Sequence, residues 1–574
     1  MRSTFLGFEV SKRTIQIAQK SLDITNNNLS NANTAGYTRQ RVDLNSTYLY
    51  KSSRFTSPVA MLSMAGQGVN AFGVSQLRDP YIDKRYREFT AYTSENDVRQ
   101  SILKETEKIL SDTGGNGLVA NLDEFKSALA KYAADSPYNK ELASVVRNEA
   151  YSICQTLHSY ASDLENLRQE NIIELNNSIS EVNDIVDRIV EYNKAITEEY
   201  NITAADKIYK KESVIGSYGP NELIDARNEL IDQLSFYANI KVYDNDDGSV
   251  KIIMGTGDEL SPNGVEIVNG NSYEHLVLKN FNSSSVSQTF EDYDAAMVVF
   301  TNGVDANKMI TTGDIRARLD MINGNGSYAS SHQNTEYGIR YYQSTVNEFA
   351  RAFAEHMNKL NSMFESYGGD GRAMFAASSD YDKDGNRVVV TVTDEDGNPV
   401  LDKDGNVVTK LADREIITAW NINISQEWLN DANMIGQVYT PDKSKPDDPD
   451  NDIWNGEWKL SLDGNNVNTI YLGVDEEFSV GRAGEFKGSI YDYLLFVDNR
   501  LSESISYYGE QYDLNSKNAN AILDTRQSIS GVSKEEEGVN MMNYQKWFNA
   551  SSRMLTTLDE MLDRLVNNTG VVGR

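Results

Sequence analysis

The feature that most constrains this chain is a long apolar seam of helical spacing at each of its two ends. From Phe8, apolar or small residues recur three and four positions apart as far as Leu29, which predicts one face of a long helix. A second row, Val10, Ile17 and Ile24, lies about 200° around the same helix, because each residue turns by roughly 100°. We therefore expect this helix to have neighbours on two faces.

A seam of the same spacing runs from Met541 to Leu565, and Trp547, Met554 and Met561 widen its apolar face. We expect the two ends to pair as a coiled coil. Such a pair buries few large side chains for the number of residues that it orders, so we expect both termini to be mobile in the isolated chain and ordered only inside an assembly. Glu535 to Glu537 open the last helix, and the helix dipole alone accounts for them.

The residues at the inner edge of each seam carry a resemblance to a known family. Residues 29–40, LSNANTAGYTRQ, resemble the N-terminal signature of the bacterial flagellar axial proteins, which are the rod, hook and hook-associated proteins. Residues 530–532 and 540–545 resemble the matching C-terminal signature. Arg39-Gln40 after the Gly-Tyr pair, and the run 230–235 ahead of a strand pair, point to the hook-associated proteins of the hook–filament junction.

Two departures from the family pattern concern fine contacts only. Ala35 stands where the family usually has Pro, and Lys546-Trp547-Phe548 replaces a more usual Gln-Ala-Tyr. The resemblance implies a non-enzymatic structural protein that self-assembles into a ring-like junction needed for filament assembly and motility. It also implies three further partners: the hook protein, the second hook-associated protein and an export chaperone. The implied location is the extracellular flagellum, reached by type III export without a cleaved signal peptide.

The residues that we expect to contact other subunits fall into two groups. Two of these residues also have a structural interpretation that accounts for part of their role: Gly36 can end the helix, and the ring of Tyr37 can pack within the chain. The N-terminal group is Phe8, Ile15, Leu22, Leu29, Asn31, Asn33, Gly36, Tyr37, Arg39 and Gln40. The C-terminal group, which we also expect to bind the chaperone, is Tyr544, Trp547, Phe548, Leu555, Leu558, Leu562 and Leu565.

Charge and cysteine content exclude several classes of function. The 574 residues include 54 Lys and Arg against 85 Asp and Glu, a net charge of −31. A nucleic-acid backbone binder needs clustered cations, so that class is excluded. No apolar run reaches the roughly 18 residues of a membrane span. The single cysteine, Cys154, cannot form an intrachain disulfide and reads as a small buried side chain.

The order of helical and strand patterns predicts an α+β fold in which the N- and C-terminal segments form one discontinuous helical-bundle rod. We expect a terminal coiled-coil domain (1–50 and 531–574), a helical rod (51–235, 301–377 and 485–530), a β-hairpin module (236–300) around Asp247-Gly248, and an inserted all-β domain (378–484). Helices are expected over residues 92–110, 118–134 and 139–197. Asn193 interrupts the seam of the last one, either as a buried residue that fixes register or as a solvated edge position.

The search for chemistry finds no catalytic, metal or cofactor motif. Asp380, Asp382 and Asp384 match half of an EF-hand calcium loop, but Thr391 stands where the bidentate carboxylate would be, so reused turns between strands are the favoured interpretation. His356 lacks a partner histidine one turn away and reads as a packed residue.

Two other functions remain open from the sequence. One is another axial protein, of the rod or the hook, although the helices predicted in the middle of this chain argue against it. The other is a secreted adhesin or enzyme displayed on a flagellar scaffold through the 378–484 insertion.

Overall fold

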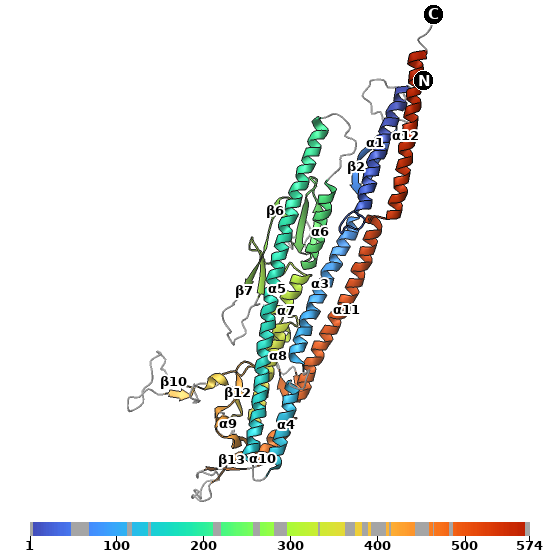
Figure 1. Cartoon of the computed structure of the whole chain (residues 1–574). Coiled ribbons are helices and arrows are strands. Elements are labelled where there is room, and N and C mark those ends of the chain that lie inside the picture. Colours follow the sequence, from blue (N-terminus) through green and yellow to red (C-terminus); the bar gives the residue numbers. More distant parts are fainter. Residues whose placement is uncertain are drawn as a thin grey trace, which may run out of the picture.

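The computed structural model of the chain is a long, narrow molecule with both termini at the same end (Figure 1). It describes residues 4–46, 68–111, 117–135, 139–209, 220–255, 264–280, 296–330, 333–361, 373–381, 388–391, 409–411, 415–441, 458–462, 464–480 and 486–568.

Four long or medium helices form the body of the rod. They are α3 (Pro80–Leu110), α4 (Leu118–Ala134), α5 (Lys140–Tyr209) and α11 (Ile490–Ser530). The 70 residues of α5 span about 105 Å at 1.5 Å per residue, and this helix runs along most of the rod (Figure 1). Helix α3 begins twelve residues before the predicted start at Tyr92, because Asp79 caps it and Pro80 occupies its first turn. The sequence did not predict this start, because charged residues interrupt the apolar spacing of the first turns.

The rod has two hydrophobic cores, one at each half of α5. In the first, Leu157 and Leu164 of α5 belong to the same buried cluster as Phe353 of α8 (Ile339–Leu360). In the second, Ile189 of α5 shares a cluster with Leu234 of α6 (Asn221–Tyr237) and with α7 (Asp314–Asn323). Because one helix carries buried residues of both cores, it fixes the two halves of the rod relative to each other.

The predicted hairpin at Asp247-Gly248 is confirmed, and it belongs to a wider sheet than we expected. Strands β3 (Ile240–Asp244), β4 (Val250–Gly255), β5 (Gly264–Asn269) and β6 (Ser272–Tyr273) form one antiparallel sheet in that order. Strands β7 (Leu276–Asn280) and β8 (Ala296–Phe300) form a separate pair. The sheet packs on the second core through Ile252 and Met254, which are fully buried.

Asn193 ties this sheet to α5 and is fully buried, which settles the choice between the two interpretations of it. Its side chain accepts hydrogen bonds from Arg227 (3.0 Å) and from the backbone N–H of Val250 (3.1 Å). It also donates to the backbone carbonyl of Gly270 (3.0 Å). A buried amide bonded to strand β4 and to the turn after β5 sets the register of helix against sheet.

The expectation of an all-β insertion over residues 378–484 is wrong for the part of it that the structure describes. Helices α9 (Gln426–Asn430) and α10 (Gly464–Gly473) lie between short strand pairs, together with 3-10 turns at Ser378–Asp380 and Ala432–Gly436. Trp428 and Ile470 are fully buried in the first core, so this part packs into the rod rather than forming a core of its own. Strand patterns of three to five residues were too short to separate strands from short helices. The strands are β9 (Phe375–Ala377), β10 (Val389–Thr391), β11 (Thr409–Leu411), β12 (Ile422–Ile424), β13 (Gln437–Pro441), β14 (Trp458–Leu462), β15 (Phe478–Val480) and β16 (Phe486–Gly488).

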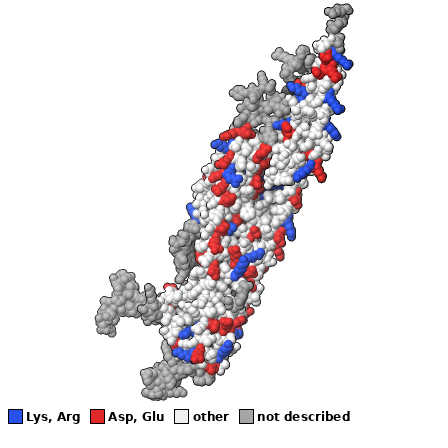
Figure 2. Space-filling model, in the orientation of Figure 1, with Lys and Arg blue, Asp and Glu red and all other residues white. Residues whose placement is uncertain are grey.

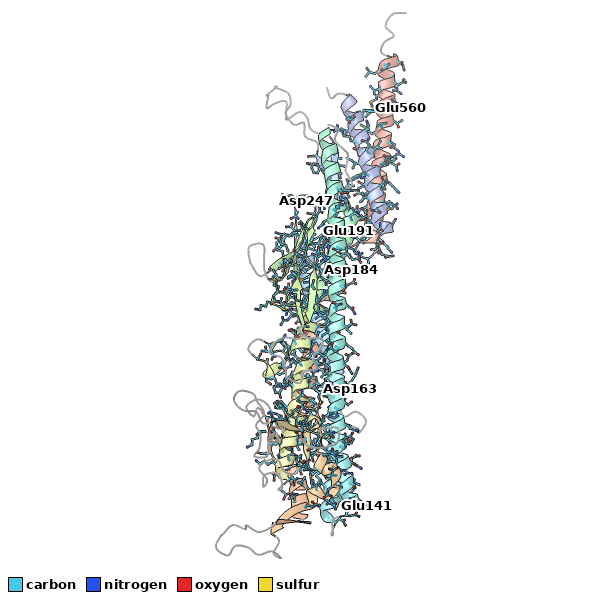
Figure 3. All side chains as sticks on the ribbon, turned by 90° about the vertical axis from the view of Figure 1, so that its left-hand side faces the viewer. Glu141, Asp163, Asp184, Glu191, Asp247 and Glu560 are labelled. Atoms are coloured by element: carbon cyan, nitrogen blue, oxygen red, sulfur yellow. The ribbon has the colours of Figure 1, made fainter. Side chains whose placement is uncertain are left out.

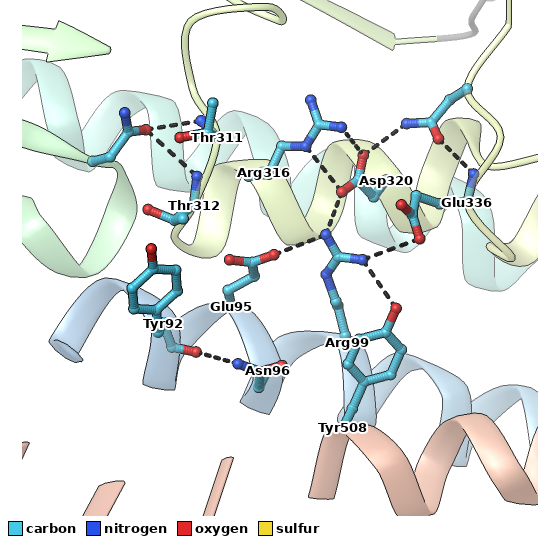
Figure 4. A network of polar contacts seen from close by, with 12 residues as sticks. Tyr92, Glu95, Asn96, Arg99, Thr311, Thr312, Arg316, Asp320, Glu336 and Tyr508 are labelled. Carbon is cyan, nitrogen blue, oxygen red and sulfur yellow. Dashed lines mark hydrogen bonds and ion pairs between the residues drawn. The ribbon is translucent and has the colours of Figure 1, made fainter. Parts of the chain in front are cut away.

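A buried ion network joins α3, α7 and α11 in the middle of the rod (Figure 4). Arg99 of α3 pairs with Glu95 (2.8 Å) and with Asp320 of α7, and it donates to the hydroxyl of Tyr508 in α11 (3.1 Å). Arg316 also pairs with Asp320 (2.7 Å). Burial raises the pKa of Glu95, although the charge of Arg99 opposes that shift. The 3-10 turn Gly326–Tyr328 follows this network before α8.

Acidic side chains are spread along the length of the rod, in keeping with the net charge of −31 (Figure 2). Glu141, Asp163, Asp184 and Glu191 follow α5 from one end towards the other (Figure 3). On the face shown, the charge is therefore spread along the rod rather than gathered in one patch.

The terminal helices α1 (Thr4–Ser30) and α12 (Lys534–Asn568) lie side by side beyond the end of α11 (Figure 1). The antiparallel strands β1 (Gln40–Ser46) and β2 (Val69–Gln76) contact α1 beside them. The predicted pairing of the two ends is thus present in the structure.

Candidate functional site

Helix α1 has neighbours on two faces, as its two rows of apolar residues predicted. A Cβ added at Gly7 would lie 3.4 Å from Leu558, which places the row of small residues through Gly7 against α12. A Cβ added at Gly68 would lie 3.1 Å from Val10, which places the Val10 row against the β1–β2 segment. The small members of the predicted seam, including Ala18, are buried, whereas its large members Phe8, Ile15, Leu22 and Leu29 are only half-buried.

Helix α12 buries one face against α1 and leaves another apolar face uncovered. Leu558 is 7% exposed, and Tyr544, Phe548, Leu555 and Leu562 are half-buried. A row on the outer side stays exposed in the single chain: Trp547 (46%), Met554 (52%), Met561 (52%) and Leu565 (57%). This exposed row is where the structure departs from the predicted seam, which placed all of these residues on one packed face.

The loop after α1 is held by amide side chains. Gly36 has φ +75°, the left-handed conformation expected of a helix stop. The Tyr37 hydroxyl donates to Oδ1 of Asn28 (2.8 Å), and the same oxygen accepts from the backbone N–H of Gln40 (3.0 Å). Asn31 donates to Oδ1 of Asn27 (3.0 Å), whereas Asn33 is exposed. Asn28 was missed by the sequence analysis, although it continues the row of Thr25.

Arg39 connects the N-terminal loop to the start of α12. Its Nε pairs with Glu537 (2.8 Å), its Nη1 pairs with Glu536 (2.7 Å), and its backbone N–H donates to the carbonyl of Ser530 (2.8 Å). The Glu537 side chain is only 3% exposed. The helix dipole is therefore not a sufficient explanation of these glutamates, because two of them bind an arginine 497 and 498 positions away.

The same loop also contacts the rod. The backbone N–H of Thr38 donates to Oδ2 of Asp225 in α6 (3.0 Å). Burial raises the pKa of Asp225 to about 6, with hydrogen bonds from Thr38 and Gln76 and the charge of Arg78 opposing the shift. Asp225 was not singled out from the sequence, since a lone acidic residue on an amphipathic helix gives no signal.

A second set of ion pairs closes the end of the rod beneath this loop. Arg526 near the end of α11 pairs with Asp83 of α3 (2.8 Å) and with Asp232 of α6 (2.7 Å). Arg87 of α3 also pairs with Asp232 (2.6 Å), and Arg78 pairs with Asp83. Helices α3, α6 and α11 thus meet at one joint made of charged side chains, and the hydrogen bond between Thr38 and Asp225 ties this joint to the loop after α1.

Metal-ligating side chains do not gather anywhere in the described residues. No group of three or more His, Cys, Asp or Glu among them could hold a metal ion. Asp380 is buried and accepts from the backbone N–H of Glu415 (2.9 Å), whereas Asp382 and Asp384 lie outside the described residues. Nε2 of His356 lies 2.7 Å from the carbonyl of Gly473, and Cys154 is buried, which raises the pKa of its thiol.

In the part of the chain that the structure describes, no helix is both long and apolar enough to cross a membrane.

Two protein-family models match the chain. The flagellar hook-associated protein FlgK helical domain matches residues 103–375, and the flagellar basal body rod FlgEFG protein C-terminal region matches residues 525–568. The second match covers all of α12 and the end of α11.

Full-length relatives carry one name. Flagellar hook-associated protein 1 of Bacillus subtilis is 26% identical over 100% of both chains. Flagellar hook-associated protein 1 of Escherichia coli is 23% identical over 96% of this chain and 98% of its own. The solved structure of the flagellar hook junction protein FlgK from Burkholderia pseudomallei is 12% identical, with a TM-score of 0.50 over 78% of this chain and 100% of that chain, and it shows a shared fold. The signatures at both ends, the paired terminal helices and these matches together show that the chain is similar over its full length to flagellar hook-associated protein 1.

Proposed function

We propose that this chain is the structural protein that joins the flagellar hook to the filament, and that it assembles there as a ring-like homo-oligomer through its terminal helix pair. The observation that carries the proposal is the exposed apolar row of α12, Trp547, Met554, Met561 and Leu565, on a helix that Arg39 holds against α1. An uncovered row of this kind on a paired helix is typical of a surface that another subunit covers.

The proposed partners follow from the family and from this surface. Hook protein lies below the junction, the second hook-associated protein lies above it, and an export chaperone covers the α12 row before secretion. Covering that row prevents aggregation of the exported chain. The proposed location is the extracellular flagellum, and the proposed role is structural rather than enzymatic.

The test is to delete the gene in its own bacterium, examine the cells by electron microscopy and assay the medium for flagellin. Bare hooks with flagellin shed into the medium are the expected result. Loss of hooks would place the chain in the rod or hook instead, and normal filaments would refute an assembly role and favour the displayed adhesin or enzyme.

A matched pair of variants then tests the surface itself. Trp547→Glu in the complementing gene is expected to leave hooks bare, because a charge replaces the apolar centre of the row. Glu560→Gln, an exposed position on the same helix (Figure 3), is the control and is expected to restore filaments. Equal restoration by both variants would contradict the proposed role of the row.

A further inference from the structure

A cleft of about 580 Å³ lies where the terminal pair meets the rod. Four aromatic residues line it: Tyr37 from the loop after α1, Tyr86 from α3, and Phe236 and Tyr237 from α6. Ser530 and Gly531, at the end of α11, complete its rim. The cleft is thus built from parts of the chain that lie far apart in sequence.

Two carboxylates one helical turn apart on α6 line this cleft, and neither is fully used by the chain itself. Asp225 is only 6% exposed, and its buried Oδ1 accepts no hydrogen bond from the described residues. Glu229 is exposed, forms no ion pair within those residues, and lies 3.0 Å (Oε2) from the position of a Cβ added at Gly36. A buried carboxylate oxygen without a partner is costly, so a donor supplied from outside the chain would stabilise it.

The arginines that line the cleft are already engaged elsewhere. Arg526 is bound to Asp83 and Asp232, and Arg78 is bound to Asp83. One nitrogen of Arg78, Nη2, is also buried without a hydrogen-bond partner among the described residues. The cleft thus holds one cationic and one anionic side chain that each have an atom without a hydrogen-bond partner in the residues that the structure describes. The lining carboxylates still outnumber the lining arginines, because Glu181 and Asp232 join Asp225 and Glu229. The cleft therefore favours a cationic group.

Cationic side chains stand beside the uncovered apolar row of α12. Lys546 directly precedes Trp547, and Arg553 directly precedes Met554. Both basic side chains are exposed and form no ion pair in the described part of the chain. A second copy that meets this molecule through its α12 row brings these two side chains along with it.

We infer that the cleft at the joint receives Lys546 or Arg553 from α12 of a second copy of this chain. The cationic head binds Asp225 and Glu229, and the aliphatic stem packs on the rings of Tyr37, Tyr86 and Phe236. The contact joins two different surfaces, so it repeats from copy to copy around a ring or a helix. It also fixes the terminal pair relative to the rod as each copy is added. This inference rests on the proposed self-assembly.

Charge exchange between the two surfaces tests the contact in cells that lack the gene and are complemented with the full-length chain. Glu229→Lys is expected to lower the fraction of cells with filaments about tenfold, because two like charges then meet in the cleft. Lys546→Glu or Arg553→Glu, whichever residue enters the cleft, is expected to lower it to a similar degree. Combining Glu229→Lys with that reversal is expected to restore the fraction to within about twofold.

Controls separate this contact from other effects of charge. Glu191→Lys on α5 and Lys517→Glu on α11 change exposed charges outside both surfaces and are expected to leave filaments intact. Thermal melting of each purified variant and its amount in the medium show that folding and export are unchanged. A carbodiimide cross-link from Glu229 to Lys546, or to Lys in an Arg553→Lys variant, provides a direct readout on isolated flagella by mass spectrometry.

Normal filaments with Glu229→Lys would overturn the inference, and so would a defect that neither α12 reversal restores. Failure of the unaltered gene to restore filaments would instead refute the proposed function, which keeps the two failures distinct.

Discussion

Arg39 and Glu537 are 498 positions apart in sequence, and their side chains meet at 2.8 Å with the glutamate almost fully buried. This pair joins the loop after α1 to the first turn of α12. A buried carboxylate held by an arginine is strongly destabilised when the arginine is removed, since its charge is then uncompensated.

Arg39→Ala is therefore expected to lower the local stability of the first turns of α12 by about 3 kcal/mol. Hydrogen exchange of the backbone amides near Glu537 measures this as faster exchange. Arg41→Ala is the control, because the Arg41 side chain is 63% exposed and pairs only with Asp43 among the described residues. Equal exchange in both variants would show that the Arg39 pair contributes nothing to the joint.

Along α12 we expect backbone protection to fall from Glu537 towards Val566, because the ion pair with Arg39 lies at one end and exposed side chains at the other. This expresses the prediction that the termini are mobile in the isolated chain. Exchange of the amides at 560–567 within seconds, against hours for the middle of α5, is the expected result. Uniform slow exchange along α12 would contradict it.

Substitutions at Leu558 and Trp547 are expected to separate an effect on the stability of the terminal pair from an effect on filament assembly. Leu558→Ala removes a buried side chain and is expected to cost about 2 kcal/mol in the unfolding of the terminal pair. Trp547→Ala removes an exposed side chain, so its cost in the isolated chain is expected to stay below about 0.5 kcal/mol, while filament assembly is lost. Local exchange measured alongside filament counts checks both. A loss of protection with Trp547→Ala would mean that the edge contact of its ring with Tyr544 stabilises the single chain.

Asp225 is expected to make the isolated chain less stable as the pH rises. Its pKa in the folded chain is about 6, above the ordinary value, so the folded state holds the proton more tightly than the unfolded state. The stabilising effect of that proton is complete below about pH 4 and is lost by a little above pH 6. Asp225→Asn keeps an acceptor for Thr38 and is expected to match the unaltered chain at pH 4 and to exceed its stability by about 2 kcal/mol at pH 8.

Denaturant unfolding of both chains across this pH range measures the difference. Asp163→Asn, an exposed change on α5, is the control and is expected to show no such pH-dependent gain. A constant difference between Asp225→Asn and the unaltered chain from pH 4 to pH 8 would show that Asp225 titrates normally. The same substitution is expected to weaken assembly, because it removes a charge that the second copy binds.

Asn193→Ala is expected to destabilise the rod by about 3 kcal/mol, because it removes the acceptor of the Val250 N–H and the donor to Gly270 at a fully buried position. Asn177→Ala on the exposed side of the same helix is expected to change stability by less than about 0.5 kcal/mol. Thermal melting distinguishes the two. Matching melting temperatures would show that the sheet keeps its register without the amide.

The sequence by itself determined the helical ends, their pairing, the long α5 and the hairpin at Asp247-Gly248, because each follows from a period or a turn signal within a short stretch of chain. The tertiary structure alone decided that Arg39 meets Glu536 and Glu537, that Asn193 is buried against the sheet, and that Trp428 and Ile470 place residues of the expected β domain in the core of the rod. It also decided which apolar row of α12 stays uncovered and that Asp225 and Glu229 line a cleft with Tyr37. These are contacts between residues distant in sequence, and periodicity describes only the face on which a side chain lies, not the partner that covers it.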